Sequence, residues 1–372
     1  MPGVGVEGVS KRFGTVRAVE TVSLSVADGR LLTLLGPSGC GKTTTLRMIA
    51  GLEQNDTGRI VIGDRVVSDA AAGVFLAPER REIGMVFQSY AIWPHMTVFE
   101  NVAYPLELRG GRRAAIREKV AHVLDLVGLT GLEGRAATAL SGGQMQRLAL
   151  CRALVYEPDL LLLDEPFSNL DAKLREQMRV ELKLLQRRLG VTVLFVTHDQ
   201  IEALSLSDRI AVMQRGRVEQ VGTPRGLYDR PASAFVRDFL GQTVVLRGRI
   251  AGRDGASVTV KMEGALAGRI LAGRAASDAP LAEGAEAQLA IRPEDIAVSA
   301  DEHPRSGDHA PGDHVLPGVI EALLFVGDRY EARVALGGEQ RILLLLSRGR
   351  EWREGQRLQL GFPPDVVSVW QA

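Results

Sequence analysis

GPSGCGKT, residues 36–43, is the stretch of this sequence that decides the fold of the chain. The charges of a nucleotide triphosphate need backbone N–H groups aimed inward, and only glycines let the main chain wrap that closely around phosphates. Lys42 can then reach the outer phosphates, and the hydroxyl of Thr43 suits a magnesium ion. We expect the whole loop to contact the nucleotide, through Gly36, Pro37, Ser38, Gly39, Cys40, Gly41, Lys42, Thr43 and Thr44.

The flanks of this loop supply the strand and the helix that a phosphate loop requires. Residues 31–35 form a run that is short and apolar enough for a buried strand. A helix is expected to follow through Leu46 and Ile49, with the positive end of its dipole at the phosphates. The alternative is a glycine-rich turn that matches by chance, but the lysine, the threonine and both flanks argue against it.

Length and composition narrow the class of protein. A chain of 372 residues is long enough for two domains. Its 45 basic and 45 acidic residues give a formal net charge of zero, which does not favour a protein that coats nucleic acid or an anionic membrane. The chain has few cysteines, no visible secretion signal and no apolar run of about 18 residues. We therefore expect it in a reducing cytosol, with any membrane role passing through another chain.

The two cysteines are expected to differ in reactivity. Cys40 lies in the phosphate loop at the start of the expected helix, close to Lys42. The helix dipole and the ammonium group favour the thiolate, so the sequence predicts a reactive Cys40. Cys151 lies in an apolar helical stretch and is expected to stay protonated and buried.

An aromatic residue ahead of the phosphate loop offers a surface for a nucleotide base. Residues 4–26 alternate in polarity, which predicts a small antiparallel sheet leading into the loop. Within it, Phe13 could stack on an adenine, because stacking needs only a flat apolar surface. The alternative is that Phe13 is an ordinary core residue of the sheet.

A second apolar run ends in two carboxylates. Residues 160–163 predict a strand buried on both faces, and Asp164 and Glu165 follow it directly. Asp164 is expected to hold magnesium through water, and Glu165 to polarise the attacking water in phosphoryl transfer. Gln88, just beyond the strand-like run 83–87, can ligate the same ion by its carbonyl, although a lone glutamine is more often a surface residue.

A third buried strand completes the expected catalytic edge. Residues 191–196 predict a strand that delivers Thr197 and His198 to the carboxyl edge of a parallel sheet, where ligands of open α/β sheets bind. A lone histidine is usually a satisfied structural group, whereas at this edge His198 could touch a terminal phosphate. We expect Glu165, His198 and Gln88 to be the catalytic residues, and Thr43, Gln88 and Asp164 to hold the metal.

A helical insert, at about residues 89–157, separates these strands in the sequence. Thr97 to Glu100 matches a capping box, and apolar residues at a spacing of 3.6 predict a further helix that ends near Gly128. The stretch LSGGQMQR, residues 140–147, then opens another helix, whose start could bind the phosphates of a nucleotide held by a second copy of the chain. The expected contacts are Ser141, Gly142, Gly143 and Gln144.

GPSGCGKT, Gln88, LSGGQ, LLLLDEP, SNLD and His198, in this order and spacing, resemble the nucleotide-binding subunit of an ATP-binding cassette (ABC) transporter. The resemblance covers residues 1–240, and LSGGQ is its most specific motif. It implies a P-loop NTPase cassette of the α/β class that binds ATP and Mg2+ and hydrolyses ATP to drive solute translocation. It also favours Phe13 as the adenine stacker, at a place where the family more often has tyrosine.

The resemblance further implies an assembly. Two copies would form a head-to-tail homodimer, with each ATP between the phosphate loop of one subunit and Ser141 to Gln144 of the other. In SNLD, residues 168–171, Asp171 is kept as a nucleotide contact and Asn169 replaces the commoner alanine. Two membrane-spanning permease subunits, served by an extracytoplasmic solute-binding protein, would complete an importer, with this chain on the cytoplasmic face of the inner membrane.

Residues 241–372 change in character to short β-type runs with glycine turns. We expect an all-β second domain with a hairpin around Arg253 to Gly255 and a second around Gly327 and Asp328. The pattern resembles the regulatory domain called TOBE, an oligonucleotide-binding (OB)-like barrel found in sugar, polyamine and ferric-iron import ATPases. Such barrels can bind nucleic acid, but 15 basic against 18 acidic residues and few aromatics argue against that here.

A polar stretch at residues 300–314 separates the two β units of this domain. Three histidines in it suggest a metal site, which the lack of cysteine and of helical spacing disfavours. These are His303, His309 and His314.

The transported substrate and the permease contact each allow more than one interpretation. Residues 88–110 look most like ferric-iron and polyamine importers, with sugar importers next. Apolar residues between Tyr90 and Tyr104, among them Trp93 and Met96, could form a groove for a permease helix, or could simply fill the core of the insert. A soluble ATPase of DNA repair or translation is disfavoured, because it would need a coiled-coil insert or two cassettes in one chain. An intact set of catalytic residues argues against a regulator that has lost hydrolysis.

Overall fold

The structure is a computed structural model that describes residues 3–276, 282–300 and 314–371. The chain divides into two compact units, Met1–Asp229 and Arg230–Ala372. The sequence predicts a boundary at residue 240, and the structure has it about ten residues earlier. The reason is that the short helix α8, Ala234–Phe239, belongs to the second unit. Arg237 of α8 donates a hydrogen bond to Gln288 at 3.4 Å and lies over the ring of Trp370, both residues of the second unit.

A six-stranded sheet forms the centre of the first unit, in the order β11, β10, β3, β9, β8, β7. All neighbouring strands run parallel except the pair β10 and β11. The strands β3, β8 and β9 are buried along their whole length, as their nearly continuous apolar sequences require. The bounds are β3 Leu31–Leu35, β7 Ile83–Val86, β8 Leu160–Asp164, β9 Thr192–Thr197, β10 Arg209–Gln214 and β11 Arg217–Gly222.

The register of this sheet brings the carboxyl ends of its central strands to one edge. Leu35 at the end of β3 pairs with Thr197 at the end of β9. Asp164 at the end of β8 pairs with Val196. The chain segments that follow these strands therefore begin side by side.

An antiparallel sheet packs on the central sheet through the first helix. Its order is β2, β1, β4, β5, β6, and the pairing confirms the small antiparallel sheet expected for residues 4–26. A single apolar core holds side chains of this sheet, of the helix and of β3, β8 and β9. The bounds are β1 Val4–Phe13, β2 Val16–Val26, β4 Thr57–Ile62, β5 Arg65–Asp69, β6 Val74–Phe75 and α1 Lys42–Ala50.

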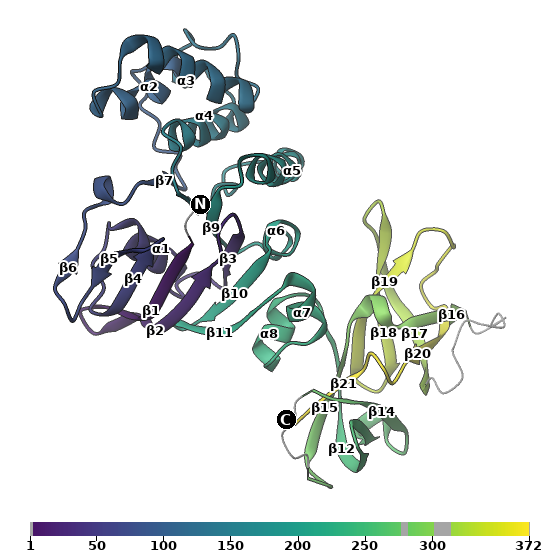
Figure 1. Ribbon diagram of the computed structural model, residues 1–372. Helices are drawn as coiled ribbons and strands as arrows, with labels where there is room; N and C mark the ends of the chain where they lie inside the picture. Colours follow the sequence, from purple (N-terminus) through teal and green to yellow (C-terminus); the bar gives the residue numbers. More distant parts are fainter. Residues whose placement is uncertain (1–2, 277–281, 301–313, 372) are drawn as a thin grey trace. The chain divides into compact units, whose positions relative to one another are not determined.

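Three helices form a group with an apolar core of its own (Figure 1). The expected capping box is present, since Thr97 Oγ1 accepts a hydrogen bond from the Glu100 N–H and the Glu100 carboxylate accepts one from the Thr97 N–H. These helices are α2 Val98–Leu108, α3 Arg113–Leu126 and α4 Gly142–Leu154, with the short turns η1 Pro78–Arg80 and η2 Ala137–Ala139 before and between them. The remaining helices of this unit are α5 Ala172–Leu189, α6 Gln200–Leu206 and α7 Pro224–Asp229.

The second unit consists of a closed barrel and a second sheet. The barrel contains β12, β13, β14, β21 and β15, and the sheet has the order β16, β20, β17, β18, β19. The expected hairpin at Arg253 to Gly255 is confirmed, because Asp254 pairs with Ser257. The bounds are β12 Val244–Asp254, β13 Ser257–Met262, η3 Gly264–Leu266, β14 Ile270–Ala275, β15 Glu286–Ile291, η4 Pro293–Asp295, β16 Ala297–Ala300, β17 His314–Phe325, β18 Arg329–Gly337, β19 Gln340–Ser347, β20 Arg357–Phe362 and β21 Ser368–Gln371.

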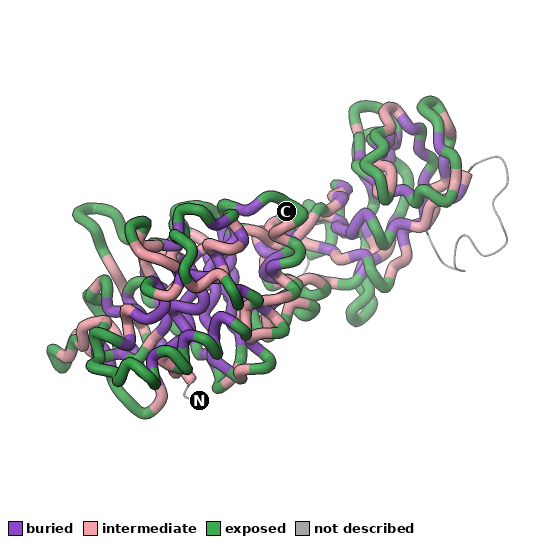
Figure 2. The backbone as a smooth tube through the Cα atoms, turned by 90° about the horizontal axis from the view of Figure 1, so that it is seen from above, coloured by how far each residue is buried: buried purple, intermediate pink, exposed green. Residues whose placement is uncertain are grey.

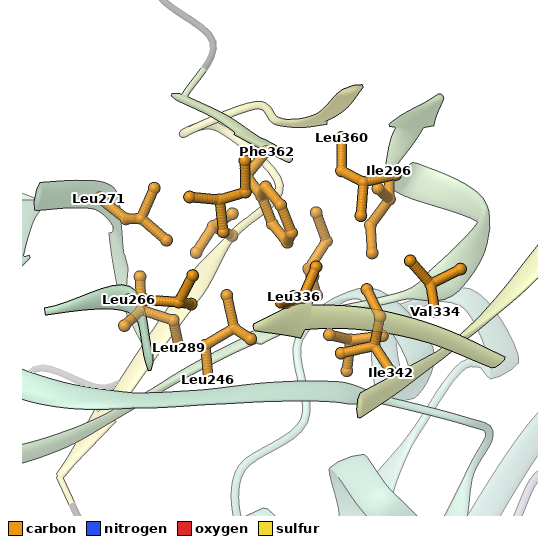
Figure 3. Packing of buried hydrophobic residues seen from close by; sticks show 14 of the residues in the cluster. Leu246, Leu266, Leu271, Leu289, Ile296, Val334, Leu336, Ile342, Leu360 and Phe362 are labelled. Carbon is orange, nitrogen blue, oxygen red and sulfur yellow. The ribbon is translucent and has the colours of Figure 1, made fainter. Parts of the chain in front are cut away.

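One apolar core joins the barrel to the second sheet. Figure 3 shows Leu246 and Leu289 of the barrel in the same cluster as Leu360 and Phe362 of the sheet. Burial alternates along strands such as β12, as expected where one face of a strand meets the core, and in Figure 2 buried positions run through both units. Residues 230–372 therefore have a core of their own.

Substitution of a residue at this junction should destabilise the second unit. Phe362 is 1% exposed, so Phe362→Ala should lower the free energy of unfolding of that unit by about 3–5 kcal/mol through the cavity it leaves. Urea titration followed by tryptophan fluorescence measures this, because Trp352 and Trp370 both lie in the second unit. Leu324→Ala, at a side chain 63% exposed, is the control and should change stability by less than about 0.5 kcal/mol. Equal effects of the two substitutions would contradict the shared core.

Candidate nucleotide-binding site

The loop between β3 and α1 approaches its neighbours too closely for any side chain at two positions. A Cβ at Gly36 would lie 2.3 Å from the carbonyl oxygen of Met213, and a Cβ at Gly41 would lie 2.4 Å from that of Ala18. Gly41 also has a φ of 102°, in the left-handed region. The loop thus packs between β10 and β2, and packing by itself requires glycine at these two positions.

Lys42 opens helix α1 and is held by the loop itself. Its side chain is 4% exposed, and its ammonium donates to the carbonyl oxygens of Gly36 at 2.8 Å and Pro37 at 3.0 Å. The first N–H groups of an α-helix have no partner within the helix. The start of α1 therefore combines unpaired N–H groups, a helix dipole and a fixed ammonium, which is an environment for phosphate.

Thr43 and Asp164 meet at the carboxyl edge of the sheet. The Thr43 hydroxyl donates to Asp164 Oδ1 at 3.1 Å. Burial raises the pKa of Asp164, and this hydrogen bond opposes the rise. The pair brings a hydroxyl and a carboxylate oxygen together, and hard oxygen atoms are the ligands that Mg2+ takes in proteins.

Glu165 and His198 form a pair beside them. His198 Nδ1 lies 3.1 Å from Glu165 Oε2, so the two expected catalytic residues are brought together. Glu165 has a φ of 46°, an unfavourable value for a residue with a side chain. Three hydrogen bonds hold its backbone there: the Glu165 N–H donates to the Val196 carbonyl, and the N–H and the hydroxyl of Ser168 both donate to the Glu165 carbonyl.

The structure contradicts the argument for a reactive Cys40. Cys40 is buried, and burial raises the pKa of its thiol more than the nearby Lys42 lowers it. The sequence argument counted the helix dipole and the ammonium but could not weigh the loss of water around the sulfur. Cys151 is buried as expected, and burial raises the pKa of its thiol as well.

Phe13 is an exposed residue at the end of the β1–β2 hairpin, so the alternative of an ordinary core residue is wrong. Its side chain is 46% exposed and pairs across the hairpin with Val16. The ammonium of Lys11 lies 5.3 Å from the centre of the ring. Ala18, further along β2, touches the phosphate loop, so the hairpin lies next to that loop.

The start of α4 is a separate site. Ser141 caps the helix, and the hydrogen bonds of Ser141 and Gln144 run to each other, in a capping box, rather than to the phosphate loop. Gly142 and Gly143 form the first turn, with Leu170 and Leu174 packed beside them. Asp171 caps α5 through the Leu174 N–H and thus follows the loop that carries Glu165.

Gln88 lies two residues beyond the end of β7. Its main-chain carbonyl accepts a hydrogen bond from the Asn169 side chain at 2.8 Å. Sequence reasoning gave Asn169 no such role. It also missed Arg152, which donates to the carbonyl groups of Tyr90 and Ala91. An arginine within the apolar residues 148–154 of α4 was the available signal.

Sequence reasoning also missed a polar network behind His198. The Thr197 hydroxyl donates to Glu202 Oε2 at 2.5 Å and accepts from the Asp199 N–H at 3.0 Å. Burial raises the pKa of Glu202, and Arg175 of α5 lies 3.8 Å from its other oxygen. The network fixes the backbone on both sides of His198.

The histidine-rich stretch gives no metal site in the described part of the chain. His303 and His309 lie outside the described residues, and His314 begins β17. Within the ranges 3–276, 282–300 and 314–371, no group of three or more His, Cys, Asp or Glu residues is arranged to hold a metal ion. The helices in those ranges likewise fall short of the length and hydropathy that a bilayer crossing requires.

Comparison with known families finds two matches. Residues 19–168 match the family described as ABC transporter, and residues 289–370 match the TOBE domain. The matches confirm the expected fold class, a P-loop NTPase cassette followed by a β-rich TOBE domain.

Several curated proteins are similar to the chain. The spermidine/putrescine import ATP-binding protein of Rubrobacter xylanophilus is 43% identical, over 99% of this chain and 92% of the relative. The Fe(3+) ions import ATP-binding protein of Rhizobium etli is 49% identical over 80% of each chain. The trehalose/maltose import ATP-binding protein of Thermococcus litoralis is 58% identical over 65% of each chain.

A solved structure is also similar. A component of the cbiONQ ABC transporter complex from Clostridium perfringens superposes with a TM-score of 0.55 and 28% identity, over 60% of this chain and 89% of that one.

The burial of Cys40 predicts slow alkylation. Because its thiol pKa is raised, the thiolate fraction at pH 7 to 8 is lower than that of a free cysteine and grows only as the pH rises further. Maleimide labelling of the native chain, followed by peptide mapping, should modify Cys40 at least about tenfold more slowly than free cysteine. The denatured chain and Cys40→Ser serve as controls. Labelling of native Cys40 at the rate of free cysteine would contradict the argument.

Proposed function

The chain belongs to the family of ATP-binding subunits of ABC importers, and from this premise we propose how its residues carry out ATP hydrolysis and with which partners it works. The observation that carries the proposal is the meeting of two pairs, Thr43 with Asp164 and Glu165 with His198, each at 3.1 Å, at one edge of the sheet. One pair suits a metal ion on the nucleotide, and the other suits the attacking water.

Residues 36–44 bind the phosphates of ATP. The N–H groups of the loop and of the start of α1 face them, and Lys42 turns from the Gly36 and Pro37 carbonyls towards the outer phosphates. Phe13 stacks on the adenine, which the exposure of its ring beside the phosphate loop supports.

Thr43, Asp164 and Gln88 would hold Mg2+, Asp164 through water. A site with one carboxylate and one hydroxyl, completed by substrate phosphates, is the kind of site that Mg2+ occupies in ATPases. When bound, the ion neutralises charge on the phosphates during transfer. Thr43 and Asp164 orient it, and the burial of Asp164 strengthens the electrostatic interaction.

Glu165 polarises the attacking water, and His198 contacts the terminal phosphate. The 3.1 Å contact fixes the direction of the carboxylate, and the network around Thr197 fixes the backbone of the histidine. Both groups are therefore held in place before substrate arrives, which is the main contribution that a protein makes to phosphoryl transfer.

Two copies form a head-to-tail homodimer. Ser141 to Gln144 begin a helix of 13 residues with an exposed serine and unpaired N–H groups, which suits the phosphates of a nucleotide bound by the other copy. Asp171 contributes from the neighbouring loop. Ser141 and Gln144 hydrogen-bond to each other and not to residues 36–44. This supports the proposal that the motif contacts the nucleotide of a second subunit.

The partners are two membrane-spanning permease subunits, with a solute-binding protein acting on the other side of the inner membrane. The permease docks at residues 90–104. Trp93 of that segment is engaged within the subunit, because its ring lies 4.7 Å from that of Tyr104 and 4.7 Å from the guanidinium of Arg152. Met96 is only partly buried. It belongs neither to the core of the three helices α2, α3 and α4 nor to the core beneath β8 and β9, so its side chain is available for contact with the permease.

The substrate is ferric iron or a polyamine, with a sugar as the alternative. Two relatives aligned over 80% or more of this chain, those of Rubrobacter xylanophilus and Rhizobium etli, carry the names of a polyamine and a ferric-iron importer, which supports the first choice. The sugar importer is the more identical relative, but its match covers only 65% of this chain. A transport assay distinguishes ferric iron, polyamine and sugar as substrates. The chain is co-expressed with the permease and binding protein encoded beside it, and uptake of each solute is measured in membrane vesicles.

Glu165→Gln should leave ATP binding intact and slow hydrolysis by at least about 100-fold, because it keeps size and removes the charge that polarises water. An ATP-bound dimer should then accumulate on gel filtration with ATP and Mg2+. His198→Ala should also suppress turnover while sparing nucleotide affinity. A monomer with normal turnover in Glu165→Gln would show that this residue has another role.

Met96→Glu should separate permease docking from hydrolysis. A charge at the proposed contact should lower transport by the assembled complex about tenfold, while the isolated subunit keeps its ATPase activity. Leu108→Glu is the matched control, since Leu108 is exposed at the end of α2 and outside residues 90–104. Normal transport in Met96→Glu, or loss of ATPase activity in the isolated subunit, would count against docking at this segment.

A further inference from the structure

The backbone of residues 88–91 is held from two sides by side chains of other elements. Asn169 Nδ2 donates to the Gln88 carbonyl at 2.8 Å. Arg152 Nη2 donates to the Tyr90 carbonyl at 2.7 Å, and Arg152 Nη1 donates to the Ala91 carbonyl. Three of the four carbonyl groups of this short segment thus accept a hydrogen bond from a side chain of another element.

The segment needs this support because its backbone is strained. Tyr90 has a φ of 62° and Ala91 a φ of 46°, so two consecutive residues with side chains lie in the left-handed region. Such residues favour other conformations unless their surroundings hold them. The two hydrogen bonds of Arg152 act on these two residues.

The guanidinium of Arg152 bonds to the carbonyl groups of Tyr90 and Ala91. Its side chain is 8% exposed, and burial lowers its pKa, although a guanidinium stays charged at neutral pH. Among the residues that the structure describes, Arg152 takes part in no ion pair, and its charge is met by the two carbonyl groups and by the ring of Trp93, 4.7 Å away. A buried charge requires such partners, so Arg152 and the segment hold each other in place.

The two holding residues come from the two elements that the proposed function assigns to the ATP of the other subunit. Arg152 lies near the end of α4, the helix that Ser141 to Gln144 begin. Asn169 lies between Glu165 and the helix cap Asp171. Arg152 and Asn169 therefore link these two elements to the segment that carries Gln88.

We propose that Arg152 and Asn169 are positioning residues that set the place of Gln88 and thereby its contribution to the Mg2+-dependent step. The proposal rests on the role of Gln88 in the proposed function. It also accounts for the side chain of Asn169, since an alanine at this position could not donate the hydrogen bond.

The test compares Asn169→Ala and Arg152→Lys with a control on the same helix. Lysine keeps the charge but lacks the planar fork that reaches both carbonyl groups. Asn169 is exposed, so its substitution does not endanger folding. Arg147→Met is the control, because Arg147 of α4 pairs with Glu181 and the Val127 carbonyl and not with residues 88–91.

The first measurement is hydrogen exchange by mass spectrometry on full-length chains without nucleotide. The N–H of Tyr90 donates to the Phe87 carbonyl and that of Trp93 to Asn101 Oδ1, so peptides covering residues 87–96 report on the segment. Loss of one hydrogen bond should speed exchange there about two- to tenfold in Asn169→Ala, and more in Arg152→Lys. Arg147→Met should leave these peptides unchanged.

The second measurement is the Mg2+ concentration that half-saturates ATP hydrolysis. It should rise about two- to tenfold in Asn169→Ala and Arg152→Lys and stay constant in Arg147→Met. If Asn169 acts through Gln88, Asn169→Ala should add nothing in a Gln88→Ala background. Ala91→Gly should restore part of the loss in Arg152→Lys, because glycine adopts a left-handed backbone freely.

Three results would overturn the proposal. Unchanged exchange of residues 87–96 in both variants would show that the hydrogen bonds do not hold the segment. Faster exchange with unchanged Mg2+ dependence, while Gln88→Ala alone shifts it, would refute the positioning role and leave the proposed function of Gln88 intact. A Gln88→Ala variant with normal Mg2+ dependence would refute that function, and the proposal with it.

Discussion

The site depends on the register of three buried parallel strands. Because Leu35 pairs with Thr197 and Asp164 pairs with Val196, the loop of residues 36–44, the carboxylates of Asp164 and Glu165, and His198 lie at one edge of the sheet. A shift of any strand by one residue would exchange the faces of its side chains, and apolar packing on both faces opposes it. The geometry of the site is thus a consequence of how β3, β8 and β9 pack.

Several strained or buried polar groups lie around this edge of the sheet. Glu165, Tyr90 and Ala91 have left-handed backbones, and Lys42 and Asp164 are buried. Hydrogen bonds support these groups: Arg152 of α4 holds the Tyr90 and Ala91 carbonyls, Ser168 holds the Glu165 carbonyl, and carbonyls of its own loop hold Lys42. Strain and buried polarity cluster where a site must be held ready before its substrate arrives. The same supports connect the phosphate loop, residues 88–91 and the start of α5 into one network.

Much of this could be predicted from the sequence, and the failures have physical causes. Glycine, lysine and acidic residues at strand ends identify a phosphate site, since few other residue types can serve there. Cys40 was misjudged because desolvation depends on neighbours such as Gly36 and Met213 that the loop meets only in the fold. The domain boundary was predicted at residue 240 because the sequence of a six-residue helix does not indicate which of two cores it packs against.

The sequence by itself determined the family and the fold class, a P-loop NTPase cassette followed by a β-rich TOBE domain, and it pointed to the residues of the candidate site. These features depend on local residue type and on the spacing of apolar residues in strands and helices, both of which are present in the sequence itself. Only the tertiary structure decided which groups touch across long separations. Asn169 reaches Gln88, and Arg152 reaches Tyr90 and Ala91, over distances of more than 60 residues in the chain. Such contacts arise from packing between elements, and no local pattern encodes them.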